Sequence, residues 1–292
     1  MHYADYKSVL LANGTMNLYR GCLHGCIYCD SRSVCYRINH PFEDIEVKRN
    51  ADVILDDQLR RRRKKAMIHT GSMCDPYIPP EDELRLTRKC LRVIARHGFG
   101  LTILSKSDRM LRDMDLFEEI HRKQKCVVQT TLTTYDEALC RRIEPNVSGT
   151  AARVEILKEC QRRGVPTVVW LSPILPFIND TEENVKGLLD YCVEAGVHGI
   201  VNFGFGVTMR EGDREYFYAQ LDRLFPGVKQ RYIDTYGLRY ECESPNNATL
   251  MKLNTETCKK HGILYKPDDV FAYLHALPEP LPQVSMFDIL GK

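Results

Sequence analysis

The feature that most constrains the fold is a regular alternation of short apolar runs with helix-like stretches between residues 50 and 205. The apolar runs, counting one before this region, cover residues 16–19, 66–70, 100–105, 125–132, 166–172 and 199–205. The helix-like stretches cover residues 49–65, 81–97, 108–123, 148–163 and 180–195. Because the strand runs are continuously apolar, they predict strands buried on both faces, as in a parallel sheet covered by helices.

About six β/α units predict an α/β fold, namely a partial (β/α)6 barrel of the TIM type, with a doubly wound sheet as the structural alternative. After residue 210 the pattern becomes helical, near residues 211–225, 247–261 and 268–275, and a Pro-rich tail follows from Pro278. We therefore predict a barrel core over residues 1–210. A helical extension with an extended tail packed on the core is predicted over residues 211–292.

The composition is that of a globular protein outside the membrane. Of the 292 residues, 43% are hydrophobic and the formal net charge is +2, which does not indicate a dedicated nucleic-acid binder. No apolar run approaches the roughly 20 residues that cross a bilayer, and no secretory signal is evident. We expect a cytoplasmic protein whose twelve cysteines are mostly reduced thiols.

Three cysteines lie close together in the segment RGCLHGCIYCD. Cys22, Cys26 and Cys29 have the spacing Cys-x3-Cys-x2-Cys. Iron–sulfur clusters usually take four thiolates, so three would leave one iron open for catalysis. The spacing alone also allows a noncatalytic protein with a structural zinc site, completed by His24 or Cys35.

This loop, with an aromatic residue before its last cysteine, resembles the signature of the radical S-adenosylmethionine (SAM) superfamily. The strings NLYRGCLHGCIYCDSRS, GSMCDPYIPPE (71–81), LSKSD (104–108) and LSPILPFINDTEEN (171–184) resemble its spore photoproduct lyase-like branch. The resemblance runs from about residue 15 to 210. It implies a radical SAM enzyme with a [4Fe–4S] cluster on the three cysteines. It also implies SAM bound to the fourth iron and reductive cleavage of SAM to a 5′-deoxyadenosyl radical that abstracts hydrogen from substrate.

The resemblance also implies a set of contacts to SAM at the carboxyl ends of the strands, where barrels and open sheets place their chemistry. Gly71 and Ser72 would meet the methionine amino group, Lys106 would pair with the methionine carboxylate, and Tyr28 would lie near the adenine. A plain turn hydroxyl and a solvated lysine are the alternative interpretations of Ser72 and Lys106.

Two further candidates follow from position. Thr130 and Thr131 end the fourth apolar run and could bind the ribose or the methionine portion, although threonine is an ordinary strand residue. Cys74 lies two residues after Ser72, hence on the same strand face. Spore photoproduct lyase uses a cysteine near here as hydrogen donor, which makes Cys74 a possible donor or else a buried thiol.

The sequence gives several hypotheses about partners. We expect a one-electron donor such as flavodoxin or ferredoxin, and a substrate that is a nucleic acid or a DNA lesion, or alternatively a peptide or small metabolite. The basic run over residues 60–65 could contact phosphates or could be a solvated helix end. The tail segment Gln283-Val284-Ser285-Met286-Phe287 resembles peptides that dock on the bacterial sliding clamp, or it packs on the body of the protein.

Overall fold

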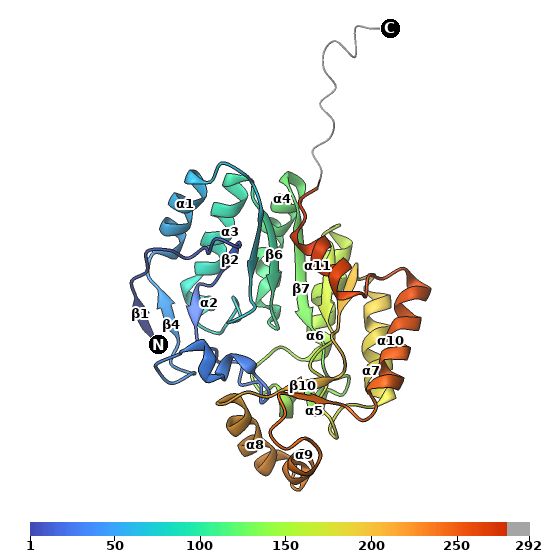
Figure 1. The fold of residues 1–292 in the computed structure, drawn as a ribbon. Helices are drawn as coiled ribbons and strands as arrows, with labels where there is room; N and C mark the ends of the chain where they lie inside the picture. Colours follow the sequence, from blue (N-terminus) through green and yellow to red (C-terminus); the bar gives the residue numbers. More distant parts are fainter. Residues whose placement is uncertain (279–292) are drawn as a thin grey trace, which may run out of the picture.

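The computed structural model describes residues 1–278 and is built around a six-stranded parallel sheet (Figure 1). The strands are β2 (Thr15–Met16), β5 (Met67–Thr70), β6 (Gly100–Leu104), β7 (Cys126–Thr131), β8 (Thr167–Trp170) and β9 (Gly199–Val201). They lie side by side in this order, and every neighbouring pair is parallel. A doubly wound sheet reverses its strand order at a switch point. The sequential order therefore confirms the partial barrel and excludes the alternative.

The outer face of the sheet is covered by the helices that connect its strands (Figure 1). These are α1 (Ala51–Arg61), α3 (Leu86–His97), α4 (Met114–Lys123), α6 (Thr150–Arg162) and α7 (Glu182–Glu194). In α7 the side chains of Val185, Leu188, Leu189 and Cys192 are buried, at positions i, i+3, i+4 and i+7. Strand side chains such as Leu101, Ile103 and Val128 fill the space beneath the helices and form the main core.

The inner face of the sheet carries the C-terminal helix α11 (Pro267–His275). Val270 and Leu274 pack on Val127, Val168 and Val201, which alternate with the outward-facing strand residues. Helix α11 lies at the amino ends of the strands. Lys125 directly precedes β7, and its ammonium group donates to the carbonyl oxygens of Tyr273 in α11 and of Ala276 just after α11. The amino end of the partial barrel is thus filled, and its carboxyl end is left for a cavity.

The remaining elements surround the carboxyl end or the flanks. Strands β1 (His2–Ala4), β4 (Glu46–Lys48) and β3 (Tyr19–Arg20) form a three-stranded sheet, and β10 (Gly206–Thr208) pairs with β11 (Glu241–Glu243). Four further helices are α5 (Glu137–Ile143), α8 (Asp213–Leu224), α9 (Val228–Tyr236) and α10 (Asn247–His261). Because β11 and Leu264 are both hydrogen-bonded to the core, the extension is joined to it. The division at residue 210 stays a prediction.

Two expected elements differ in detail. The apolar run 16–19 is divided between two sheets, since β2 joins the barrel whereas β3 pairs with β4. The helix expected over 81–97 is two helices, α2 (Glu81–Leu84) and α3, broken at Arg85 with φ of +47°. The backbone N–H of Thr87 in α3 donates to the carboxylate of Glu81 at 2.8 Å, so the break is stabilised by a local side-chain acceptor.

The basic run 60–65 lies at the end of α1, on the chain that leads into the amino end of β5. Arg60 and Arg61 both pair with Asp57 one turn earlier, at 2.6 and 2.5 Å. Arg62 donates to the Leu11 carbonyl oxygen. The run therefore lies at the opposite end of the barrel from the carboxyl edge of the sheet.

No helix within residues 1–278 is both long and apolar enough to cross a membrane. All twelve cysteines lie within the described residues, and none of them forms a disulfide. The clamp-like segment from Gln283 to Phe287 lies outside the described residues, and so does most of the tail that was expected to pack on the core.

Candidate active site

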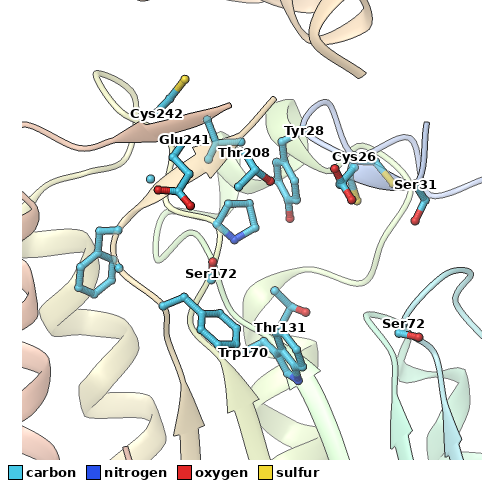
Figure 2. A pocket seen from close by; sticks show the side chains of 18 of the residues that line it. Cys26, Tyr28, Ser31, Ser72, Thr131, Trp170, Ser172, Thr208, Glu241 and Cys242 are labelled. Atoms are coloured by element: carbon cyan, nitrogen blue, oxygen red, sulfur yellow. The ribbon is translucent and has the colours of Figure 1, made fainter. Parts of the chain in front are cut away.

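A cavity of about 470 Å³ opens at the carboxyl ends of the parallel strands (Figure 2). Its floor is formed by residues at the ends of four neighbouring strands, and its sides by the three-cysteine loop and the antiparallel pair of strands β10 and β11. The strand-end residues that line it are Ser72, Leu104, Lys106, Thr131 and Trp170. The cavity lies where both barrel and open-sheet folds place their chemistry, as expected.

The three-cysteine loop follows β3 and borders this cavity through Cys26 and Cys29. Gly21 and Gly25 have φ of +83° and +69°, a conformation that side chains rarely adopt. A Cβ atom on Gly21 would lie 2.3 Å from the Phe42 carbonyl oxygen. The loop is thus pressed against neighbouring backbone, and its first glycine has no room for a side chain.

The thiols are not gathered at the spacing of a zinc site. A tetrahedral zinc ion with bonds of about 2.3 Å to sulfur needs donor atoms roughly 4 Å apart. Within residues 1–278, no set of three donor atoms lying within 4.8 Å of one another includes Cys22, Cys26 or Cys29. His24 and Cys35 therefore do not complete a compact zinc site with them. Cys35 is exposed and instead lies 3.3 Å from the Arg210 guanidinium.

The three thiols lie in different electrostatic surroundings. The contact with the Cys74 thiol lowers the pKa of Cys22 below its ordinary value, and the same contact raises the pKa of Cys74. Burial raises the pKa of both Cys26 and Cys29. The Lys106 ammonium group lies 3.6 Å from the Cys26 sulfur and opposes that effect. A cationic group is therefore already placed where a thiolate would be held.

Asp75 connects the cysteine loop to the two neighbouring strand ends. One of its carboxylate oxygens accepts from the Ser105 hydroxyl at 2.7 Å and from the Tyr77 backbone N–H at 2.8 Å. The other accepts from the Lys106 backbone N–H at 2.8 Å and lies 3.3 Å from Nδ1 of His24. Asp75 raises the pKa of His24 against the opposing effect of burial. One buried carboxylate thus fixes three segments of the site.

A second buried carboxylate, Glu144, lies below the cysteine loop. Arg153 pairs with one oxygen at 2.5 Å, and the Lys106 ammonium lies 3.1 Å from the other, which also accepts from the Tyr28 hydroxyl. Burial by itself would raise the pKa of Glu144, but Arg153 and Lys106 outweigh burial and hold it below its usual value. Two cations face one carboxylate, so the group carries one net positive charge at the cavity wall.

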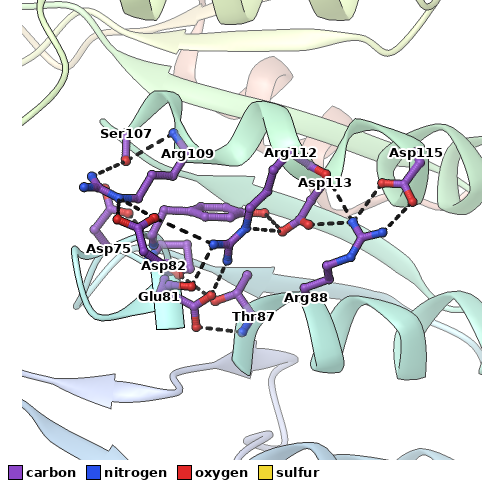
Figure 3. Close-up of polar contacts among 12 residues, drawn as sticks. Asp75, Glu81, Asp82, Thr87, Arg88, Ser107, Arg109, Arg112, Asp113 and Asp115 are labelled. Carbon is purple, nitrogen blue, oxygen red and sulfur yellow. Dashed lines mark hydrogen bonds and ion pairs between the residues drawn. The ribbon is translucent and has the colours of Figure 1, made fainter. Parts of the chain in front are cut away.

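A polar network beneath the segment 75–82 holds the start of the cysteine loop (Figure 3). Glu81 is fully buried and pairs with Arg112 at 2.5 Å. It also accepts from the hydroxyl of Tyr19, which lies three residues before Cys22. On the far side, Asp113 accepts from Arg88 at 2.7 Å and from the Tyr77 hydroxyl at 2.9 Å. The network therefore ties the loop to helices α2, α3 and α4.

The sequence model of the Radical SAM superfamily matches residues 16–192, more than half of the chain. The chain belongs to this superfamily. The uncharacterized protein Rv2578c of Mycobacterium tuberculosis is 29% identical over 228 residues, which are 76% of this chain and 66% of that protein. MJ0683 of Methanocaldococcus jannaschii is 33% identical over 173 residues, 59% of this chain and 64% of that protein. The chain thus spans just under two thirds of the length of these relatives.

Solved structures of spore photoproduct lyase share the fold. The structure of that enzyme with a dinucleoside spore photoproduct has a TM-score of 0.60 and 12% identity, and the match covers 85% of this chain and 74% of that chain. A radical SAM Nalpha-GlyT isomerase of Pseudomonas phage M6 is 24% identical over 203 residues, 70% of this chain and 40% of that protein. The superfamily implies an iron–sulfur cluster and SAM, so the site has to accommodate both.

The geometry fits these two groups. Three free thiols, the ligand type that iron–sulfur clusters use, extend from a loop fixed by glycines and backbone hydrogen bonds. Two of the cysteines border a cavity of about 470 Å³, and the net positive charge near Lys106 lies on the same wall. A small zwitterionic molecule with a carboxylate suits this combination of space and charge.

The structure brings most of the predicted radical SAM residues together. Tyr28, Ser72, Lys106 and Thr131 all line the cavity. Gly71 precedes Ser72 with φ of +102°, and a Cβ atom there would lie 2.0 Å from the Leu104 carbonyl oxygen. Gly71 thus lets β5 approach β6 closely enough to present Ser72.

Two predicted residues lie elsewhere. Thr130 is fully buried and, by strand alternation, lies on the opposite face from Thr131, away from the cavity. The Cys74 thiol lies behind the cysteine loop, where it donates to the Gly21 carbonyl oxygen at 2.7 Å, and it does not line the cavity. A hydrogen-donor role for Cys74 stays a prediction, whereas Ser72 is the residue of that segment at the cavity.

Sequence analysis missed Glu144, Arg153 and Asp75. The position of Arg153 could have been noticed in the sequence. Arg153, Leu157 and Cys160 are spaced four and three residues apart, so they share the buried face of an expected helix. A cation on such a face needs a buried anion. Glu144 had no comparable signal, since it follows the short helix α5, which the apolar pattern did not reveal.

We predict that Glu144→Gln lowers the free energy of unfolding by about 3–5 kcal/mol, because it leaves the fully buried Arg153 without a counter-charge. Denaturant unfolding of the purified protein measures this. The matched control is Glu118→Gln, which removes an exposed partner of Arg163 and should change stability by less than about 1 kcal/mol.

The stabilisation by Glu144 should depend on pH, because it requires the ionised carboxylate. The pKa of Glu144 is lowered in the folded protein, so its stabilisation is complete above the ordinary glutamate pKa of about 4.3 and is lost as the pH falls further. The difference between wild type and variant should be constant from pH 8 to 6 and should shrink below about pH 4. An equal loss for Glu118→Gln would show that Glu144 has no special role.

Proposed function

We propose that this protein holds a [4Fe–4S] cluster on Cys22, Cys26 and Cys29 and uses it to cleave SAM reductively, starting a radical reaction on a second molecule in the same cavity. One observation carries this proposal. A three-cysteine loop borders a cavity at the carboxyl end of a partial barrel, and the one lysine that lines that cavity within residues 1–278 is itself paired within a buried ion group.

The bound cluster, once reduced, would supply the electron that breaks the sulfonium C–S bond of SAM. Around it, the chain provides binding, orientation and exclusion of water. Lys106 would hold the methionine carboxylate, the Ser72 hydroxyl oxygen would accept a hydrogen bond from the methionine amino group, and the Thr131 hydroxyl would donate a hydrogen bond to the ligand from the floor of the cavity. Tyr28 keeps Lys106 in place through a hydrogen bond of 2.7 Å.

Lys106 suits a carboxylate ligand for a reason of charge balance. Glu144 is already neutralised by Arg153, so the positive charge of Lys106 is only partly compensated. An anion at the cavity wall would complete the balance in a region of low dielectric, where such a pair is strong. A neutral residue at this position would leave the folded network intact but remove the attraction.

We propose that the second molecule contains a nucleobase. Trp170 and Phe203 lie with ring centroids 6.3 Å apart, and Phe203 is 64% exposed, so both rings offer stacking surface to a flat group. Asp30, Glu241 and Glu243 also line the cavity, and carboxylates repel phosphates. This combination favours a base or nucleoside inside the cavity with any phosphates outside it.

The expected partners and compartment remain parts of the same proposal. A one-electron donor such as flavodoxin or ferredoxin would reduce the cluster. Twelve free cysteines, most of them buried, support a reducing compartment such as the cytoplasm. The basic run 60–65 lies at the other end of the barrel, away from the proposed substrate cavity.

The primary test is production of 5′-deoxyadenosine. Protein purified and reconstituted anaerobically with iron and sulfide should form it from SAM and dithionite, as measured by mass spectrometry. Cys26→Ala should abolish the product because a cluster ligand is lost. Cys35→Ala, which changes an exposed thiol outside the cavity, should retain it. Zinc in place of iron, or product that persists in Cys26→Ala, would overturn the proposal.

We predict that Lys106→Gln raises the KM for SAM by about 10- to 100-fold, the size expected for losing one charge-assisted hydrogen bond. The ion pair of Glu144 with Arg153 remains in this variant, so the fold should persist. Lys186→Gln, on an exposed helix face, serves as the control and should leave KM unchanged. An unchanged KM in Lys106→Gln would remove this residue from the SAM site.

The substrate class is tested with the same assay. Short single-stranded deoxyoligonucleotides should increase the rate of 5′-deoxyadenosine formation, and mixed tripeptides should not. Phe203→Ala should raise the oligonucleotide concentration required by about 5- to 150-fold, the range for one stacked base. Leu238→Ala, which is 89% exposed, is the control. Stimulation by peptides alone would replace the nucleobase proposal with a peptide substrate.

A further inference from the structure

A second group of metal-ligating side chains lies outside the cavity, on the three-stranded sheet that precedes the cysteine loop. His2 of β1 and Glu46 of β4 are paired in register, and His40 belongs to the loop before β4. One donor atom from each residue lies within 4.8 Å of the others. Nε2 of His2 is 3.6 Å from a carboxylate oxygen of Glu46.

The hydrogen bonds of the two histidines determine which nitrogen of each ring is left to act as a ligand. Nδ1 of His2 lies 2.9 Å from the Asp44 carboxylate, and Nδ1 of His40 lies 3.0 Å from the Pro41 carbonyl oxygen. Both partners can only accept, so in each ring Nδ1 carries a proton. In the neutral rings, Nε2 is then left with a lone pair. Metal-ligating histidines are oriented in the same way, by a carboxylate or backbone carbonyl on the other nitrogen.

Glu46 is oriented as well. Its Oε1 atom accepts from the Tyr6 hydroxyl at 2.5 Å and lies 3.9 Å from the Arg20 guanidinium. Its Oε2 atom is the one that faces His2. The carboxylate therefore has one oxygen engaged by neighbours and one directed to the histidines.

The three side chains therefore bring potential metal ligands close to one another. Within residues 1–278, Nε2 of His40 is shielded from solvent and has no hydrogen-bond partner. Buried polar atoms are nearly always satisfied, and His40 is grouped with a carboxylate and a second imidazole, so its unpartnered Nε2 atom is suited to bind a cation. Two imidazoles and a carboxylate are ligands that zinc accepts, with a further position open to water.

We propose that His2, His40 and Glu46 bind a divalent transition-metal ion, zinc in the first instance. The site joins β1 and β4 to the loop 37–43. That loop contacts the cysteine loop directly, because the Phe42 carbonyl oxygen accepts from the Cys22 backbone N–H at 3.1 Å. The ion therefore braces the segment on which Cys22 rests. The inference is independent of the proposed radical function.

The test uses full-length protein with its iron–sulfur cluster reconstituted and with a purification tag that lacks histidine. After dialysis against a chelator, zinc is titrated and the bound metals are measured by mass spectrometry. We expect one zinc per chain in addition to the iron. His40→Gln and Glu46→Gln should each weaken zinc binding by at least about 100-fold. Asp44→Asn, which changes the carboxylate that pairs with Nδ1 of His2 and with the N-terminal ammonium group, should weaken it by about 10- to 100-fold.

The matched control is His97→Gln. His97 forms a similar histidine–carboxylate pair with Asp56, at 2.5 Å, but belongs to no group of three ligands in the described part of the chain. This variant should keep full zinc binding. Equal zinc content in wild type and His40→Gln would overturn the proposal, and so would failure of the wild-type protein to bind zinc at micromolar concentration.

X-ray absorption at the zinc edge separates this site from zinc trapped by unoccupied cysteines. The proposal requires nitrogen and oxygen neighbours at about 2.0–2.2 Å and no sulfur, whereas a cysteine site shows sulfur at about 2.3 Å. Zinc should also raise the unfolding temperature of the wild type and leave that of His40→Gln unchanged. Sulfur neighbours, or an equal temperature shift in both proteins, would contradict the proposal.

Discussion

The buried carboxylate of Glu144 is the interaction on which the arrangement of the cavity depends. Transferring a carboxylate from water to a protein interior costs several kcal/mol unless cations and hydrogen bonds replace the water. Here Arg153 from α6, Lys106 from the end of β6 and Tyr28 from the cysteine loop supply them. Because these partners come from three separate parts of the chain, satisfying one charge brings the parts into a single geometry.

The carboxylate of Asp75 likewise holds separate segments together, here by binding the backbone near the ends of β5 and β6. Its oxygens accept from Ser105, Tyr77 and the Lys106 backbone, so the ends of β5 and β6 cannot shift relative to each other without losing hydrogen bonds. Gly71 makes that closeness possible, since any side chain there would overlap the Leu104 carbonyl group. The two carboxylates together place Lys106, one through its backbone and the other through its ammonium group.

The barrel has two chemically different ends because its inner face is only partly filled. Helix α11 covers the amino end with Val270 and Leu274, while the carboxyl end keeps the cavity and its polar wall. The basic run 60–65 belongs to the filled end, where Asp57 neutralises part of it. The basic run belongs to the first β/α unit, yet it lies far from the cavity, because it precedes a strand and the cavity lies where the strands end.

Much of this was readable from the sequence. Continuously apolar strand runs separated by amphipathic helices gave the partial barrel, since side-chain periodicity is a local property that each segment carries on its own. The loop with Cys22, Cys26 and Cys29, together with the motifs at the strand ends, resembled the radical SAM superfamily, because ligands on one short loop are constrained by that loop alone. The strand ends gave Ser72, Lys106 and Thr131, because parallel strands bring their carboxyl ends to one edge.

Only the tertiary structure decided which side chains face one another across long stretches of sequence. Glu144 meets Tyr28 and Lys106, and His40 meets His2 and Glu46, through contacts between segments with no shared periodicity. Cys74 and Thr130 looked equivalent to Ser72 and Thr131 in sequence, yet they lie away from the cavity. A pattern along the chain specifies the face of an element. The partner of that face depends on how the elements pack, and packing is a property of the whole chain.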